Sequence, residues 1–263
     1  MEELYTLFYN DYSICSIMVR YTIALSRRMP GEKVSIEEKP INIQHGGQLT
    51  EYYLCEVNPR GTVPVLKGPS SSKVLKTPLS ESVDITYFLA ERFPSLCPPH
   101  LSQQIRRLLA ELHDINYFSL TYTRKPQRAS DMENSVLSLL SDPAISSRWR
   151  EALKFKLDVV RATRAPALTK EAVAVQEAKA SSFLSQIETL LAGSEGTGSP
   201  WIFGSEDPTA LDAHVVPFAA RLIDVGRQGM LPDRVRAYAD RAFDAEPWKE
   251  VMQGRKTVYG TYL

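Results

Sequence analysis

The chain has 263 residues, 43% hydrophobic and 24% charged, which suits one large or two modest domains with hydrophobic cores and argues against disorder. Its formal net charge is +0, so there is no basic surface signal for nucleic acid. No apolar run is long enough for a membrane span, and the N-terminus lacks the features of a signal peptide. We therefore expect a cytoplasmic protein that binds neither nucleic acid nor membrane. Cys15, Cys55 and Cys97 form no CxxC pair, which indicates neither a disulfide framework nor a metal site.

Apolar patterns in the N-terminal third predict a mixed α/β domain. Its predicted elements are, in chain order, a strand at 4–9, a helix at 13–29, a strand at 33–39, a short helical run at 49–57, a hairpin of 63–66 with 73–76, and a helix at 82–92. This order predicts parallel strands in the first half of the domain and an antiparallel pair in the second.

Strand patterns end after a stretch rich in proline and polar residues. The predicted elements beyond it are one long helix at 101–122, a polar stretch with prolines at 123–147, and helices at 149–164 and 170–192. Thr209 and Asp212 have the spacing of a capping box at the start of a further helix. We therefore predict an α+β domain at 1–93, a linker at 94–102 and an all-α domain at 103–263.

Two neighbouring motifs in the first domain indicate a binding site. Pro64 interrupts an apolar strand pattern, and a cis Val63–Pro64 bond would free the Val63 backbone to pair with an extended ligand. Glu81 and Ser82 follow at a predicted helix start, where backbone N–H groups favour a carboxylate and Glu81 offers a partner for an ammonium group. A ligand with a peptide-like middle and an amino-acid end would suit both. Alternatively, these are an ordinary edge strand and an ordinary helix cap.

The predicted order, with its Val–Pro step and a helical second domain, resembles a cytosolic glutathione transferase with a thioredoxin-like N-terminal domain. The resemblance is closest to the zeta class, the class of the maleylacetoacetate isomerases, and covers residues 4–92 in detail. Three zeta-like elements carry it: SICSIMVR at 13–20, INIQHGGQ at 41–48 and NPRGTVP at 58–64. Ile14 and Met18 depart from the class, because they replace polar residues. The long segment at 124–172 is more similar to larger fungal enzymes of specialised metabolism.

The resemblance implies that glutathione binds along the first domain. Val63, next to Pro64, would pair with its cysteinyl backbone. Glu81 and Ser82 would bind the γ-glutamyl end, and Gln48 would lie near the glycyl end.

Ser13 matches the serine that stabilises the glutathione thiolate in the zeta class. A hydroxyl donor near a helix N-terminus favours the thiolate, which is the nucleophile. Cys15 is the competing candidate, because a cysteine in the first turn of a helix can itself be a thiolate of low pKa, as in a thiol transferase.

The resemblance also implies an acceptor site near Tyr117, Tyr122 and Arg124, and a homodimer. Neither Arg221 nor Arg227 has the offset of the arginine that holds a small dicarboxylate in zeta-class isomerases. We therefore expect a transferase that adds glutathione to a hydrophobic electrophile, such as a secondary metabolite. The alternatives are a glutathione-dependent cis–trans isomerase, a Cys15-dependent thiol transferase and a non-catalytic ligand carrier.

Overall fold

The computed structural model describes residues 3–260, and within them the chain forms two compact units. The first unit contains the described residues up to Asn10, then Ser35–Glu81 and Asn116–Val175. The second contains Asp11–Val34, Ser82–Ile115 and the described residues from Gln176 onward. Each unit therefore combines segments that are distant in the sequence. The predicted linker at 94–102 stays a prediction.

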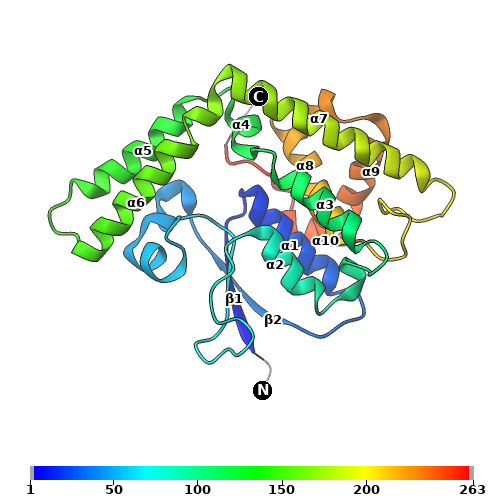
Figure 1. Ribbon diagram of the computed structural model, residues 1–263, viewed down its shortest axis with the longest axis horizontal. Helices are drawn as coiled ribbons and strands as arrows, with labels where there is room; N and C mark the ends of the chain where they lie inside the picture. The colour runs from blue at the N-terminus through cyan, green and yellow to red at the C-terminus, as the bar shows by residue number, and fades with distance from the viewer. Residues whose placement is uncertain (1–2, 261–263) are drawn as a thin grey trace. The chain divides into compact units, whose positions relative to one another are not determined.

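The first unit is built on a three-stranded sheet in the order β2-β1-β3. Figure 1 shows β1 and β2 of this sheet side by side. Its strands are β1 at Leu4–Tyr9, β2 at Ser35–Pro40 and β3 at Val65–Lys67. β1 is central, parallel to β2 and antiparallel to β3. It carries the apolar side chains Leu7 and Phe8, which are buried. The predicted parallel pairing of the first two strands is confirmed.

The predicted hairpin is wrong at its second strand. Leu66 pairs with Leu79 in an isolated antiparallel bridge, whereas residues 73–76 lie in a loop. The loop that opens at Gly68 and Pro69 is longer than predicted, and within it Lys73, Val74 and Lys76 are exposed. The strand-like pattern of residues 73–76 therefore arises from a loop in which only Leu75 is buried.

The predicted helical run at 49–57 is interrupted. A 3₁₀ turn, η2, covers Gly47–Leu49, and a π-helical turn, η3, covers Tyr53–Val57. Between them Thr50 is extended, and its hydroxyl accepts a hydrogen bond from the Tyr53 N–H. A threonine that caps the second turn thus breaks the pattern. Another 3₁₀ turn, η1, precedes them at Ile43–His45.

The long helix predicted at 101–122 is two helices. The helix α3 covers Ser102–His113 and α4 covers Tyr117–Tyr122. Asn116 separates them, because its side chain accepts hydrogen bonds from the Phe118 and Ser119 N–H groups and caps α4.

The polar stretch predicted at 123–147 contains a helix, α5, at Gln127–Leu140. Pro126 stands at its N-terminus, where a missing N–H costs nothing, so this proline begins a helix. Only Ala129 and Val136 of α5 are buried, which explains the weak apolar pattern. Figure 1 shows α5 beside α6, the helix at Ser147–Thr163.

The second unit is helical, with α1 at Ile14–Ser26 packed on α2 at Ser82–Ala90, α8 at Ala210–Asp224 and α10 at Glu246–Met252. The helix α9 covers Asp233–Asp244, and α7, which spans both units, covers Lys170–Gly193. Three 3₁₀ turns complete the described chain: η4 at Pro94–Leu96, η5 at Pro166–Leu168 and η6 at Gln228–Met230. No described helix is both long and apolar enough to cross a bilayer.

The predicted capping box at the start of α8 is confirmed. The Asp212 carboxylate accepts hydrogen bonds from the Thr209 N–H and hydroxyl, both at 2.8 Å. It also accepts from the Ile202 N–H at 3.0 Å and from the Tyr238 hydroxyl at 2.9 Å. This fully buried carboxylate therefore joins α8 to α9 and to the loop before α8.

Candidate functional site

Ser13 and Cys15 stand at the N-terminal end of α1, as the sequence predicts. Ser13 is the N-cap, with an extended backbone, and its hydroxyl accepts a hydrogen bond from the Ser16 N–H at 3.4 Å. Both side chains are half-buried, and Cys15 is a thiol. The first turn of α1 contains no acidic residue, so the positive end of the helix dipole is not offset within that turn.

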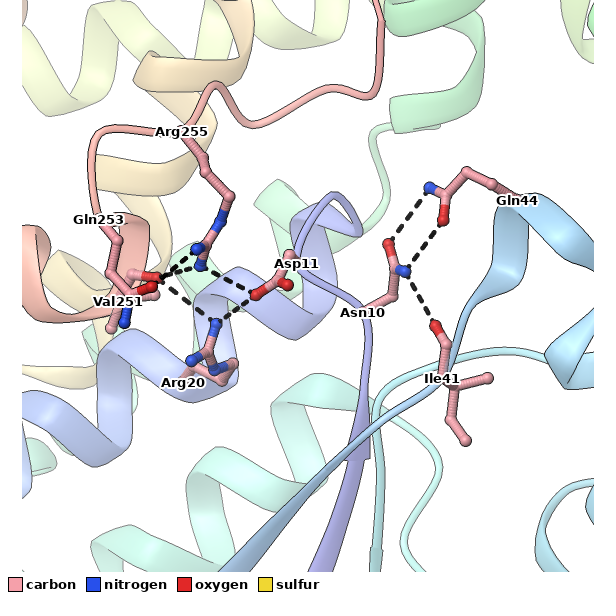
Figure 2. Close-up of polar contacts among 8 residues, drawn as sticks. All are labelled: Asn10, Asp11, Arg20, Ile41, Gln44, Val251, Gln253 and Arg255. Atoms are coloured by element: carbon pink, nitrogen blue, oxygen red, sulfur yellow. Dashed lines mark hydrogen bonds and ion pairs between the residues drawn. The ribbon is translucent and has the colours of Figure 1, made fainter.

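Gln48 lies in η2 with a buried Oε1 that has no hydrogen-bond donor among the described residues. A buried acceptor without a donor costs free energy, unless a bound molecule supplies the donor. Gln48 therefore offers an acceptor to a ligand that carries an N–H or O–H group. Nearby, the Asn10 side chain at the end of β1 donates to the Ile41 carbonyl at 2.9 Å and to the Gln44 Oε1 at 3.1 Å (Figure 2).

The Val63–Pro64 peptide bond is cis. Val63 packs against the buried cluster of Phe8, Tyr53 and Val65. The residue before it, Thr62, is held through its carbonyl, which accepts a hydrogen bond from the Tyr53 hydroxyl at 2.7 Å. The backbone of this turn is thus anchored to the η3 segment.

Lys156, on α6, is a residue of this region that sequence reasoning missed. Its ammonium group donates to the carbonyl of Arg60 at 2.6 Å and to that of Gly61 at 3.1 Å, just before the cis bond. Lys156 is only 2% exposed. Burial, aided by the charges of Arg164 and Arg60, lowers its pKa to about 7. The sequence feature that could have revealed its role is a lysine among the apolar residues on one face of α6.

Glu81 and Ser82 differ in their surroundings. Glu81 is exposed, at the end of a segment of the first unit. Ser82 is buried, 4% exposed, and begins α2 in the second unit. The predicted helix start is therefore confirmed, while their binding roles stay predictions.

The aromatic residues near the predicted acceptor site pack against one another and against cations. Tyr117 and Tyr122 are half-buried in α4, and Arg124 is exposed just beyond it. The Tyr122 ring lies 4.7 Å from that of Phe118, centroid to centroid. The Arg164 guanidinium lies 4.8 Å from the Phe118 ring centroid, within range of a cation–π interaction. Sequence reasoning did not connect Arg164 with this group.

Among residues 3–260, no three His, Cys, Asp or Glu side chains are grouped so that they could hold a metal ion. Cys55 and Cys97 are also thiols and half-buried.

The sheet order, the cis Val–Pro step and the helices that follow define the glutathione transferase fold, with a thioredoxin-like N-terminal domain and an all-α C-terminal domain. The β-etherase LigF from Sphingobium sp. strain SYK-6 has a TM-score of 0.66 and 16% identity, with 95% of this chain and 98% of that chain covered.

A glutathione transferase from Pseudomonas putida with bound glutathione disulfide has a TM-score of 0.56 and 13% identity over 96% of this chain and 92% of its own. A bacterial zeta-class maleyl pyruvate isomerase has a TM-score of 0.53 and 17% identity over 94% and 95%. No family model matches the chain, and no curated protein matches its sequence.

Proposed function

We propose that this protein is a glutathione-dependent transferase in which Ser13 stabilises the glutathione thiolate. The observation that carries the proposal is Ser13 at the N-cap of α1, directly after the first strand of a glutathione transferase fold. The orphaned Gln48 acceptor and the Val63 backbone beside cis Pro64 fit a peptide-like ligand. The Pseudomonas putida neighbour, which holds glutathione disulfide, adds support.

Glutathione supplies a thiolate whose electron pair forms a sulfur–carbon bond to an electrophilic carbon, while the displaced pair leaves with the leaving group or is protonated by water. The Ser13 hydroxyl donates a hydrogen bond to the sulfur. The N-terminal end of α1 adds a positive partial charge, so both favour the anion over the thiol. A thiol of ordinary pKa about 8.5 is thereby ionised at neutral pH.

The other residues hold the ligand. Val63 pairs with the cysteinyl backbone beside Pro64, and Glu81 with Ser82 binds the γ-glutamyl end. Gln48 accepts a hydrogen bond near the glycyl end, which would satisfy its buried Oε1.

The acceptor substrate is a hydrophobic electrophile, and a secondary metabolite of a fungal-type pathway fits the resemblance. Tyr117, Tyr122 and Arg124 contact it. The half-buried rings of α4 supply apolar area with polar edges, and Arg124 supplies an exposed cation for a substrate with a negative group. We propose a cytoplasmic homodimer as the working form, by analogy with the glutathione transferases.

Isomerisation is the second candidate, favoured by the likeness to a zeta-class maleyl pyruvate isomerase. Addition to a conjugated double bond, rotation about it and elimination would return glutathione unchanged. Ser13 would have the same task in both reactions, because both begin with the thiolate. A Cys15 thiol transferase and a ligand carrier are the remaining alternatives.

The test combines purified protein and glutathione with a panel of conjugated enones, polyenes and aryl ethers, followed by mass spectrometry and NMR. Conjugation is identified by a mass gain of one glutathione for an enone or polyene, and by a glutathionyl product together with the released leaving group for an aryl ether. Altered double-bond geometry at unchanged mass identifies isomerisation. We expect Ser13→Ala to lower turnover about 10- to 100-fold, the value of one hydrogen bond to a charged group.

Cys15→Ser is the matched control, since it changes a neighbouring side chain in the same turn and keeps Ser13. Equal turnover in Ser13→Ala would remove Ser13 from the mechanism. Loss of mixed-disulfide reduction in Cys15→Ser would instead favour the thiol transferase, and glutathione binding without turnover of any electrophile would favour a carrier.

A further inference from the structure

Asp11, two residues before Ser13, is held by two arginines. Its Oδ1 accepts hydrogen bonds from the Arg20 Nη1 at 2.9 Å and the Arg255 Nη2 at 3.0 Å (Figure 2). Both arginines also donate to the Val251 carbonyl at the end of α10, at 3.4 and 3.0 Å. The three charged side chains are only 31%, 11% and 27% exposed, so water screens these ion pairs less than it screens pairs at the open surface.

Tyr12, between Asp11 and Ser13, contacts Arg221 of α8 and Tyr259 near the C-terminus. Its carbonyl accepts a hydrogen bond from the Arg221 Nη2 at 2.8 Å. Arg221 is buried and also donates to the Thr257 carbonyl, at 2.6 Å. The Tyr12 ring lies 5.2 Å from that of Tyr259 in an edge-to-face arrangement.

Arg255, Thr257 and Tyr259 belong to one stretch, residues 253–260, which we call the C-terminal segment. It begins where α10 ends. Gln253 caps that helix in the left-handed conformation, at φ 48°, and turns the chain back. The side chain of Gln253 accepts a hydrogen bond from the Arg255 Nη1 at 2.8 Å, which fixes the guanidinium in its direction toward Asp11 (Figure 2).

We propose that the C-terminal segment positions Ser13, with Arg255 and Asp11 as its positioning residues. The inference rests on the proposed function. Ser13 follows directly on a loop that belongs to no helix or strand. In this loop Asp11 and the Tyr12 ring contact the C-terminal segment. The Tyr12 carbonyl is bound by Arg221, which itself contacts that segment. A hydroxyl must lie within a few tenths of an ångström of its place to donate a good hydrogen bond to sulfur, so a looser loop would weaken that bond.

A direct electrostatic effect of these charges on the bound thiol is the competing explanation. The two explanations predict opposite shifts of the thiol pKa for Asp11→Asn. If Arg255 acted through its charge, Arg255→Gln would raise the pKa of the bound thiol and Asp11→Asn would lower it. If the contact positions Ser13, both substitutions weaken it, because each removes one charge of the ion pair, and both raise that pKa. The pair of variants therefore separates position from charge.

The experiment measures glutathione binding by calorimetry and the pKa of the bound thiol by its ultraviolet absorbance across a pH series. Both are measured in the wild type, Arg255→Gln and Asp11→Asn. We expect both variants to bind glutathione within about threefold of the wild type and to raise the thiol pKa by about 1 unit, which is about a tenfold loss of thiolate at pH values below the wild-type pKa. At such a pH, turnover should fall about tenfold through kcat, with little change in KM for glutathione.

Two further variants complete the test. Arg236→Gln removes an exposed arginine of α9 that pairs with Asp240, and it should leave the thiol pKa unchanged. Arg255→Lys keeps the charge but not the planar fork, so it should recover only part of the effect. It also serves as the readout should Arg255→Gln fail to fold.

The outcomes distinguish the inference from the proposed function. A wild-type protein that does not bind glutathione, or binds it with an ordinary thiol pKa, would overturn the proposed function. Binding with a lowered thiol pKa in the wild type, together with opposite shifts or no shift in the two variants, would overturn the positioning role alone.

Discussion

Lys156→Met is the substitution whose effect on stability has the clearest pH signature. The ammonium group of Lys156 is buried, and burial with the neighbouring Arg164 and Arg60 charges lowers its pKa from 10.5 to about 7. In the unfolded chain the amine stays protonated up to its ordinary pKa. Between these values the unfolded state binds more protons than the folded state, so the free energy of unfolding rises with pH. Below the folded pKa the cost of the buried charge is constant.

The slope from one such group is about 1.4 kcal/mol per pH unit, so the wild type should gain about 2 kcal/mol between about pH 7 and about pH 9. Lys156→Met abolishes this gain. It also leaves the Arg60 and Gly61 carbonyls without their donor, at a cost of about 1–3 kcal/mol that does not depend on pH. The stability of the wild type relative to the variant should therefore rise by about 2 kcal/mol between about pH 7 and about pH 9.

The assay is urea denaturation at a series of pH values across this range, with the difference between variant and wild type as the readout. Lys154→Met is the matched control, because Lys154 is an exposed lysine on the same helix. Tyr53, whose pKa burial raises, is common to all variants, so its contribution cancels in the difference. Parallel curves for the wild type and Lys156→Met would refute the reasoning, since they would mean that Lys156 titrates alike in both states.

Two further predictions concern the second unit. Burial lowers the pKa of His113 to about 4, so the unfolded state binds more protons as the pH falls below 6.5, and stability should drop by about 3 kcal/mol toward pH 4. Acid denaturation of His113→Gln should be shallower by that amount, and an identical acid transition would contradict the assignment. Asp212→Ala removes the shared acceptor of Thr209, Ile202 and Tyr238. Each buried donor left without an acceptor costs about 1–3 kcal/mol, so the free energy of unfolding should fall by about 3 kcal/mol or more. A loss below about 1 kcal/mol in thermal or urea unfolding would show that water replaces the carboxylate.

Features set by local chemistry could be predicted from the sequence. The strand β1, the Ser13 cap of α1 and the Thr209 capping box each depend on neighbours within about four residues. Periodicity and capping preferences act over that range. This explains why the predicted starts of α1, α2 and α8 agree with the structure.

Features set by distant contacts could not be predicted. The second strand of the hairpin was assigned to residues 73–76 because alternation does not reveal which apolar residue reaches the sheet, and the bridge forms at Leu79. The break between α3 and α4 depends on the Asn116 side chain, which suits a cap but is also tolerated within a helix. In α5 the apolar stripe is too narrow to give a helical period.

Lys156 and Arg255 were missed for a related reason. Each is a long cationic side chain whose partner lies in an irregular segment remote in the sequence. Lys156 binds the backbone carbonyls of Arg60 and Gly61, and Arg255 binds the Asp11 carboxylate in the loop before α1. The polar groups of such segments need partners that no helix or sheet hydrogen bond supplies. A sequence motif can therefore identify Ser13 and Val63, while the residues that fix the adjoining turns must be found in the structure. If this is correct, Arg255→Gln should alter the chemistry of the bound thiol, whereas loss of the Arg236 ion pair should not.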